Sequence, residues 1–162
     1  MFIIARFLCQ IREALIGKLR GITRDNFVMV RTSFDPDAAA KDYAEKLFRL
    51  GKKSLDLLLL GMGPDGHTCS LFPGHPLLNE TKLTVAPITD SPKPPAQRIT
   101  LTYPVLNAAK AVAFVCTGEG KREVVKAILE DGADYPAARV RPEGENELYW
   151  ILDQPAASLL SQ

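Results

Sequence analysis

The sequence has few of the residues that build disulfide frameworks and no run that could cross a membrane. Its three cysteines are too few and too scattered for a disulfide framework, so we expect a reducing, cytoplasmic environment. The apolar start, residues 1–8, is short, is interrupted by Arg6 and has no small-residue cleavage site after it. We therefore expect neither a signal peptide nor a membrane partner.

An excess of charge of one sign is also missing. The formal net charge is +1, and the basic residues are spread along the chain without forming a stripe. A nucleic-acid partner would favour such a stripe, so we expect none. With 162 residues and 46% hydrophobic residues, the chain can bury one sizeable core, and we predict a single domain over residues 1–162.

Short apolar runs alternate with helical patterns, which predicts an α/β fold with a mainly parallel sheet and helices on both faces. The runs 55–60 and 111–116 are so apolar that we expect strands buried on both sides. We also expect strands at 27–32, 83–89, 99–103 and 148–152. Helices are expected at 9–20, 119–131 and 154–161 and between Asp35-Pro36 and Gly51. A short helix or turn is expected at 104–110 and a Pro-rich loop at 90–97.

We expect the chemistry in the loop that follows the run 55–60. Gly61, Gly63 and Gly66 allow sharp turns and a close approach of the backbone to a ligand. A helical turn after Gly66 would point N–H groups at an anion or a developing oxyanion. His67 can take a proton from water near neutral pH, and Asp65 can orient the imidazole or the water. This combination suits the hydrolysis of an ester-like bond.

Three other interpretations of this loop are open. The glycines match G-x-G-x-x-G, but prolines follow too soon for the crossover helix of a dinucleotide site. A structural turn with a solvent-exposed histidine fits the residue types equally well. A zinc site would use His67, Cys69, His75 and Cys116, whose spacing fits no standard ligand pattern, so we expect no metal.

A second loop, residues 116–122, follows the run 111–116. It resembles a shortened phosphate loop, but the Walker A spacing fails and Arg122 stands where Ser or Thr is needed, which argues against NTP hydrolysis. Lys121 at a helix start can still hold one phosphate, although a solvated surface lysine is the commoner case. Arg98 after the Pro-rich loop is another candidate for anion contact, and its alternative is a salt bridge at a strand start.

Four segments together resemble the 6-phosphogluconolactonase family, namely residues 57–73, 91–102, 104–109 and 117–121. The resemblance implies hydrolysis of 6-phospho-D-glucono-1,5-lactone to 6-phospho-D-gluconate in the oxidative pentose phosphate pathway, without a metal or organic cofactor. It also implies that His67 is the general base and that Asp65 and the backbone of residues 61–66 shape the site. Arg98 and Lys121 are then the candidates for the phosphate group.

The resemblance begins near Ile11, and residues 1–10 are atypical. The family carries a Gly-Gly-Ser phosphate loop and an Asp-Glu-Arg segment, whereas this sequence has no Gly-Gly pair. We therefore expect a chain that is truncated at its N-terminus relative to the family, as an isoform or an incomplete gene model. The alternatives to an active lactonase are a non-catalytic phosphosugar-binding or interaction fragment and a sugar-phosphate isomerase or deaminase of the same fold. The sequence makes no prediction of the oligomeric state.

Overall fold

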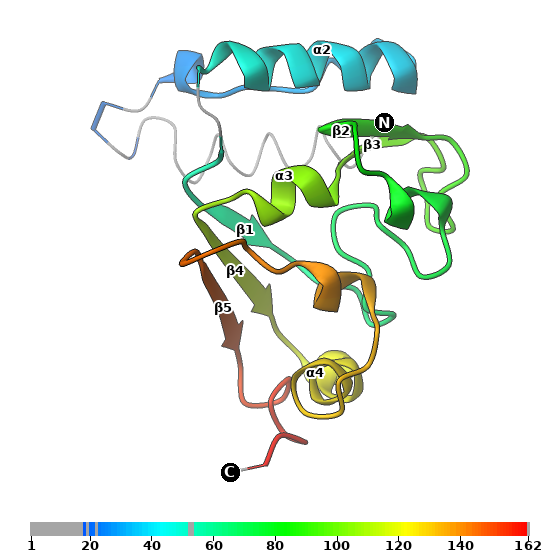
Figure 1. Cartoon of the computed structure of the whole chain (residues 1–162), viewed down its shortest axis with the longest axis vertical. Helices are drawn as coiled ribbons and strands as arrows, with labels where there is room; N and C mark the ends of the chain where they lie inside the picture. The colour runs from blue at the N-terminus through cyan, green and yellow to red at the C-terminus, as the bar shows by residue number, and fades with distance from the viewer. Residues whose placement is uncertain (1–17, 19, 22, 52–53, 162) are drawn as a thin grey trace.

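A three-stranded parallel sheet and a β-hairpin covered by a helix form the protein (Figure 1). The computed structural model describes residues 18, 20–21, 23–51 and 54–161. In chain order the elements are η1 (Arg24–Asn26), α2 (Pro36–Arg49), β1 (Leu58–Leu60), η2 (Pro76–Asn79), β2 (Val85–Ile88), β3 (Arg98–Leu101), α3 (Tyr103–Asn107), β4 (Ala111–Cys116), η3 (Glu119–Lys121), α4 (Arg122–Leu129), η4 (Pro136–Arg139) and β5 (Glu147–Leu152).

β4 is the central strand of the parallel sheet, with β1 on one side and β5 on the other. On its inner face, Phe114 is buried and stacks on Trp150 of β5, with ring centroids 4.4 Å apart. The same face packs against α3 through Leu106 and against α4 through Val125 and Ile128. The predicted α/β class and the predicted parallel sheet are confirmed.

The opposite face of this sheet is exposed. Leu58 and Leu60 are buried, but Leu59 between them is 69% exposed, and Val115 and Ile151 are also exposed. Because side chains alternate across a strand, an apolar run can still place every second residue in solvent. The prediction that runs 55–60 and 111–116 are buried on both sides is therefore wrong for this face.

Helix α2 packs against the antiparallel hairpin of β2 and β3 (Figure 1). Its start is the predicted one, because the Asp35 side chain accepts a hydrogen bond from the backbone N–H of Ala38 at 2.9 Å. Its end is also the predicted one, since Gly51 has φ +68°, a conformation that glycine adopts at little cost. The small buried residues Ala39 and Ala40 allow the close approach to the hairpin.

The predicted strand at 27–32 is wrong. Residues 27–31 form no regular secondary structure, and they pair with no strand of the described residues. The segment is bonded to a side chain instead, since Lys46 Nζ of α2 donates to the carbonyl of Met29 at 3.0 Å. High β-propensity is not sufficient for a strand, because a ladder needs a neighbouring strand. The predicted helix at 9–20 lies outside the described residues, except for residues 18 and 20.

The predicted helix at 154–161 is also wrong. One hydrogen bond has helical spacing, from Ala157 N–H to Asp153 C=O, and those that follow from Ser158 and Leu160 span three residues. The segment is therefore a series of turns. No helix of the described residues has the length and apolar character needed to cross a membrane.

Candidate active site

The glycine-rich loop leaves the carboxyl end of β1 and folds back on itself. Gly63 N–H donates to the carbonyl of His67 at 2.8 Å, and Gly66 N–H donates to the carbonyl of Gly63 at 2.9 Å. A Cβ atom on Gly63 would lie 2.1 Å from Nδ1 of His67, and Gly66 has φ +74°. The loop therefore requires glycine at both positions. Thr68 Oγ1 closes the base of the loop by donating to the carbonyl of Gly61 at 2.9 Å.

The predicted helical turn after Gly66 does not form. Cys69 has φ +52°, which a right-handed helix cannot contain, and Leu71 N–H donates to Thr68 C=O in a tight turn instead. Ser70 N–H donates to Thr100 Oγ1 at 3.0 Å, so this turn is tied to β3. The chain therefore places the half-buried His67 directly before a buried, hydrogen-bonded turn and not at a helix N-terminus.

His67, Asp65 and Lys93 form a cluster of three charged or titratable groups. His67 Nδ1 lies 2.5 Å from Asp65 Oδ1, and Lys93 Nζ lies 2.9 Å from Asp65 Oδ2 and 3.3 Å from His67 Nδ1. Because the carboxylate is the acceptor, we assign the ring proton to Nδ1. His67 Nε2 has no hydrogen bond to any described residue, so it is the nitrogen available to take a proton.

Asp65 is ionised at neutral pH. Its partial burial raises its pKa, but the hydrogen bonds from Lys93 and His67 outweigh burial and lower the pKa to about 2. A carboxylate that stays charged fixes the orientation of the imidazole. It also stabilises the imidazolium that forms when the ring takes a second proton.

Phe72 contacts both the cluster and Arg98. The His67 and Phe72 rings have centroids 4.7 Å apart, and Arg98 Cζ lies 5.7 Å from the Phe72 centroid. The guanidinium donates to three carbonyls of the Pro-rich loop: Nε to Pro95 at 2.7 Å, and Nη2 to Lys93 at 2.6 Å and to Pro94 at 2.8 Å. Among the described residues Arg98 forms no ion pair, so the alternative of a salt bridge is not what the structure shows.

Lys121 joins the second loop to the first. Its Nζ donates to the carbonyl of Met62 in the glycine-rich loop at 2.6 Å. The second loop is held in turn by Asp153, whose two carboxylate oxygens each lie 3.0 Å from Gly118 N. β1 and β4 are parallel neighbours, so the loops at their carboxyl ends meet at one edge of the sheet. The two predicted loops therefore lie together.

Lys93 is the residue of this cluster that our sequence analysis missed. It lies 26 positions after His67, so no local spacing connects the two residues. A weak signal was present, because Lys93 is the one cation between the prolines of the Pro-rich loop. Prolines restrict the backbone, which favours a fixed position for the residue between them.

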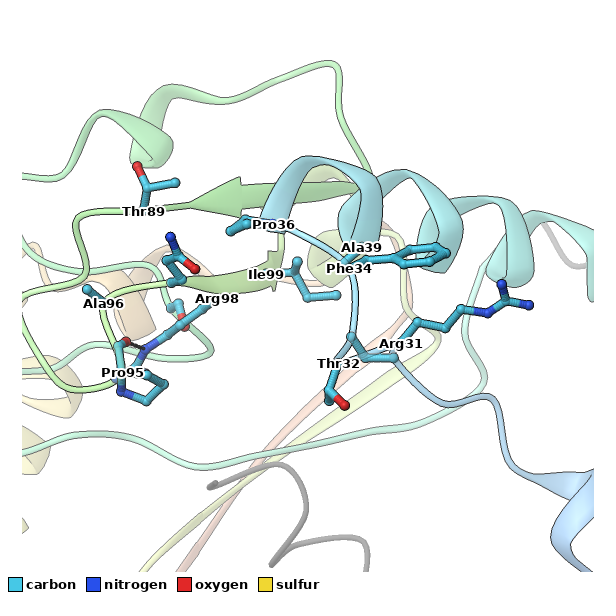
Figure 2. Close-up of a pocket in the computed structure, with 13 residues that line it drawn as sticks. Arg31, Thr32, Phe34, Pro36, Ala39, Thr89, Pro95, Ala96, Arg98 and Ile99 are labelled. Carbon is cyan, nitrogen blue, oxygen red and sulfur yellow. Dashed lines mark hydrogen bonds between the residues drawn. The ribbon is translucent and has the colours of Figure 1, made fainter. Parts of the chain in front are cut away.

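A pocket of about 630 Å³ lies beside this site, between the chain at 30–36 and the Pro-rich loop (Figure 2). Arg98 and Ser70 form part of its wall, but Asp65, His67 and Lys121 do not line it. The pocket is thus adjacent to the cluster and does not contain it.

The zinc alternative has no support in the part of the chain that the structure describes. His75 is 3.1 Å from Asp90, and Cys116 is buried in β4. Within the same residues no group of three or more His, Cys, Asp or Glu side chains is placed to hold a metal ion.

The profile of the family described as glucosamine-6-phosphate isomerases/6-phosphogluconolactonase matches residues 5–150. The chain is 54% identical over 155 residues to 6-phosphogluconolactonase of Rattus norvegicus, covering 93% of this chain and 60% of that protein, and 53% identical over 156 residues to the Homo sapiens protein, with the same coverage. The chain thus spans about 60% of the length of these curated relatives.

Solved structures are also similar to this chain. The structure is similar to that of 6-phosphogluconolactonase from Thermotoga maritima, with a TM-score of 0.74 and 31% identity over 88% of this chain and 63% of that one. A crystal structure of devB protein superposes with a TM-score of 0.78 and 29% identity, over 87% of this chain and 61% of that one.

Proposed function

Because the chain belongs to the family of glucosamine-6-phosphate isomerases and 6-phosphogluconolactonases, we propose that it hydrolyses 6-phospho-D-glucono-1,5-lactone to 6-phospho-D-gluconate. The observation that supports this most directly is the Asp65–His67 pair. It orients an imidazole whose Nε2 has no hydrogen bond to the described residues. Ester hydrolysis at neutral pH needs such a base, because water is a weak nucleophile until a proton is removed from it.

The proposed reaction uses His67 twice. Nε2 takes a proton from water while the water oxygen attacks the lactone carbonyl carbon, and the carbonyl electron pair moves onto its oxygen. Collapse of the tetrahedral intermediate breaks the bond between that carbon and the ring oxygen. The imidazolium then returns its proton to the leaving ring oxygen, and the product is an open-chain carboxylic acid that ionises. Asp65 stabilises the imidazolium between the two transfers.

We assign the 6-phosphate group of the substrate to Lys121. Its ammonium group lies against the glycine-rich loop, where a substrate held near His67 would also lie. One donor is used on Met62, and a lysine ammonium has three, so two are available for phosphate oxygens. Arg98 is the other cation that the sequence suggested, and its geometry supports a different role, given below.

Hydrolysis of freshly prepared lactone, measured above the spontaneous rate, tests this proposal. We expect turnover by the purified chain and a loss of about 10²- to 10⁴-fold in kcat for His67→Ala. Lys121→Met should raise KM for the phosphorylated lactone and leave the weaker hydrolysis of D-glucono-1,5-lactone unchanged. A folded chain without turnover would contradict the proposal, and turnover of glucosamine 6-phosphate would favour the other activity in the family description.

A further inference from the structure

We propose that Arg98 is a positioning residue, which holds the Pro-rich loop so that Lys93 is fixed against Asp65 and His67. The proposal rests on the function proposed above, in which this pair supplies the base. It replaces the prediction that Arg98 binds the phosphate of the substrate.

The guanidinium is directed at the loop backbone. Nε donates to Pro95 and Nη2 donates to both Lys93 and Pro94, so three N–H groups are used on three consecutive carbonyls. Figure 2 shows the Arg98 side chain turned toward Pro95 on one wall of the neighbouring pocket. Of the five N–H groups, only the two on Nη1 take no part in these bonds to the described residues, whereas bidentate phosphate recognition by arginine typically uses N–H groups from two nitrogens.

The loop needs a donor of this kind. Pro94 and Pro95 have no N–H groups, so they cannot donate to each other's carbonyls or to those of a neighbouring strand. One fork of N–H groups on a planar guanidinium can satisfy several carbonyls at once, whereas a lysine ammonium is a point charge on a flexible stem. Ser91 supports the same turn, since its Oγ donates to the carbonyl of Lys93 at 2.8 Å.

A rigid backbone at Lys93 helps to fix the position of the Lys93 ammonium group. A lysine side chain has many rotamers, so it holds a single position only when its base is rigid and its end is bonded. The carbonyl of Lys93 is bonded by Arg98, and its Nζ is 2.9 Å from Asp65 Oδ2. Arg98 also lies over Phe72, whose ring contacts His67. The guanidinium thus contacts two supports of the Asp65–His67 pair, the Lys93 backbone and the Phe72 ring.

The closing experiment compares Arg98→Lys with Lys93→Met and with Gln97→Ala, an exposed neighbour in the same loop, as the matched control. The first readout is the pKa of the Asp65 carboxyl group, followed by NMR titration. We expect Lys93→Met to raise it from about 2 toward the ordinary value near 3.8, Arg98→Lys to raise it in the same direction, and Gln97→Ala to leave it unchanged.

The second readout is kinetic. We expect Arg98→Lys to lower kcat by about 10- to 100-fold with little change in KM, because the charge is kept and the geometry is lost. An unchanged Asp65 pKa together with a raised KM would overturn the proposal in favour of phosphate binding. If the wild-type chain shows no turnover and Arg98→Lys still shifts the Asp65 pKa, the proposed function fails while the positioning role of Arg98 stands.

Discussion

The two histidines of this chain each lie against an aspartate, but their surroundings differ. His67 Nδ1 is 2.5 Å from Asp65, and His67 Nε2 has no hydrogen bond to the residues that the structure describes. His75 uses both nitrogens, because Nδ1 accepts from Leu77 N–H at 3.2 Å and Nε2 lies 3.1 Å from Asp90. An Nδ1 atom that accepts leaves the ring proton on Nε2, which donates to Asp90.

The difference shows that a histidine–carboxylate contact does not by itself identify a base. His75 connects the start of η2 to the Pro-rich loop, and its hydrogen bonds leave no ring nitrogen for a substrate. The second oxygen of Asp65 is bonded to Lys93, and the Asp65 side chain is 36% exposed. The Asp90 side chain is 73% exposed. The first pair therefore differs from the second in two ways: Asp65 is bonded on both oxygens, and His67 Nε2 has no hydrogen bond to the described residues.

The largest expected contrast is in kcat. His67→Ala should lower kcat by about 10²- to 10⁴-fold, whereas His75→Ala should leave it unchanged, since only the first removes the proposed general base. Steady-state hydrolysis of the phosphorylated lactone by both variants measures the contrast, and circular dichroism checks that each is folded. Equal losses in the two variants would show that the pairs do not differ in the way their geometry indicates.

A second contrast lies in the carboxylates. Asp65→Asn should lower kcat by about 10²- to 10⁴-fold, because a carboxamide neither selects the Nδ1–H tautomer nor stabilises an imidazolium. Asp90→Asn is the matched substitution and should leave kcat at the wild-type value. The expected loss should not be recovered by saturating substrate, since Asp65 acts on the ring and not on binding. A pure KM effect in Asp65→Asn would argue that this carboxylate contacts substrate instead.

The sequence predicted those parts of the fold that depend on local chemistry. Asp35 and Gly51 delimit α2 because a cap and a left-handed turn are properties of single residues. The exposure of Leu59 could not be predicted, because a strand's composition does not reveal whether a second layer covers it. The strand at 27–32 failed for a similar reason, since pairing depends on a distant partner.

The site divides in the same way. Asp65 and His67 lie two residues apart on one loop, and their contact could be predicted from that spacing. Lys93 could not be found by spacing. It lies in the connection between β2 and β3, and only the fold of this hairpin brings it to the glycine-rich loop. Arg98 was found as a cation, but its direction depends on carbonyls that only the folded Pro-rich loop presents. Residue type was therefore predictable, whereas the partner of each residue was not.

For stability, His75 is expected to contribute through the hydrogen bond that its Nδ1 accepts from Leu77 N–H. His75→Ala should lower the free energy of unfolding by about 1 kcal/mol, because it leaves the Leu77 N–H without its cap. His75→Asn should regain about half of that loss, since asparagine caps well but does not reach Asp90 in the same way. Urea denaturation of the three proteins measures the order. If Ala and Asn are equally stable at this position, the cap contributes nothing.

The smallest expected effect is the dependence of stability on acid pH. The pKa of Asp65 is lowered to about 2, below its ordinary value of 3.8, so the unfolded chain binds more protons between these values. The stabilisation by Asp65 is therefore complete above about pH 4 and is lost as the pH falls toward 2. We expect a contribution of only about 0.5–1 kcal/mol, because a carboxylate that is one-third exposed is partly screened by solvent.

Asp90 offers the comparison for this effect. The hydrogen bond from His75 lowers the pKa of Asp90 as well, so its contribution has the same sign, but its greater exposure makes the slope smaller. Free energies of unfolding at pH 3 and pH 6 for the wild type, Asp65→Asn and Asp90→Asn test the order. The gap between the wild type and Asp65→Asn should narrow at pH 3. A gap that is independent of pH would mean that Lys93 and His67 do not hold the Asp65 carboxylate in solution. His67 Nε2, which has no hydrogen bond to the described residues, would then lack the orientation on which the proposed mechanism depends.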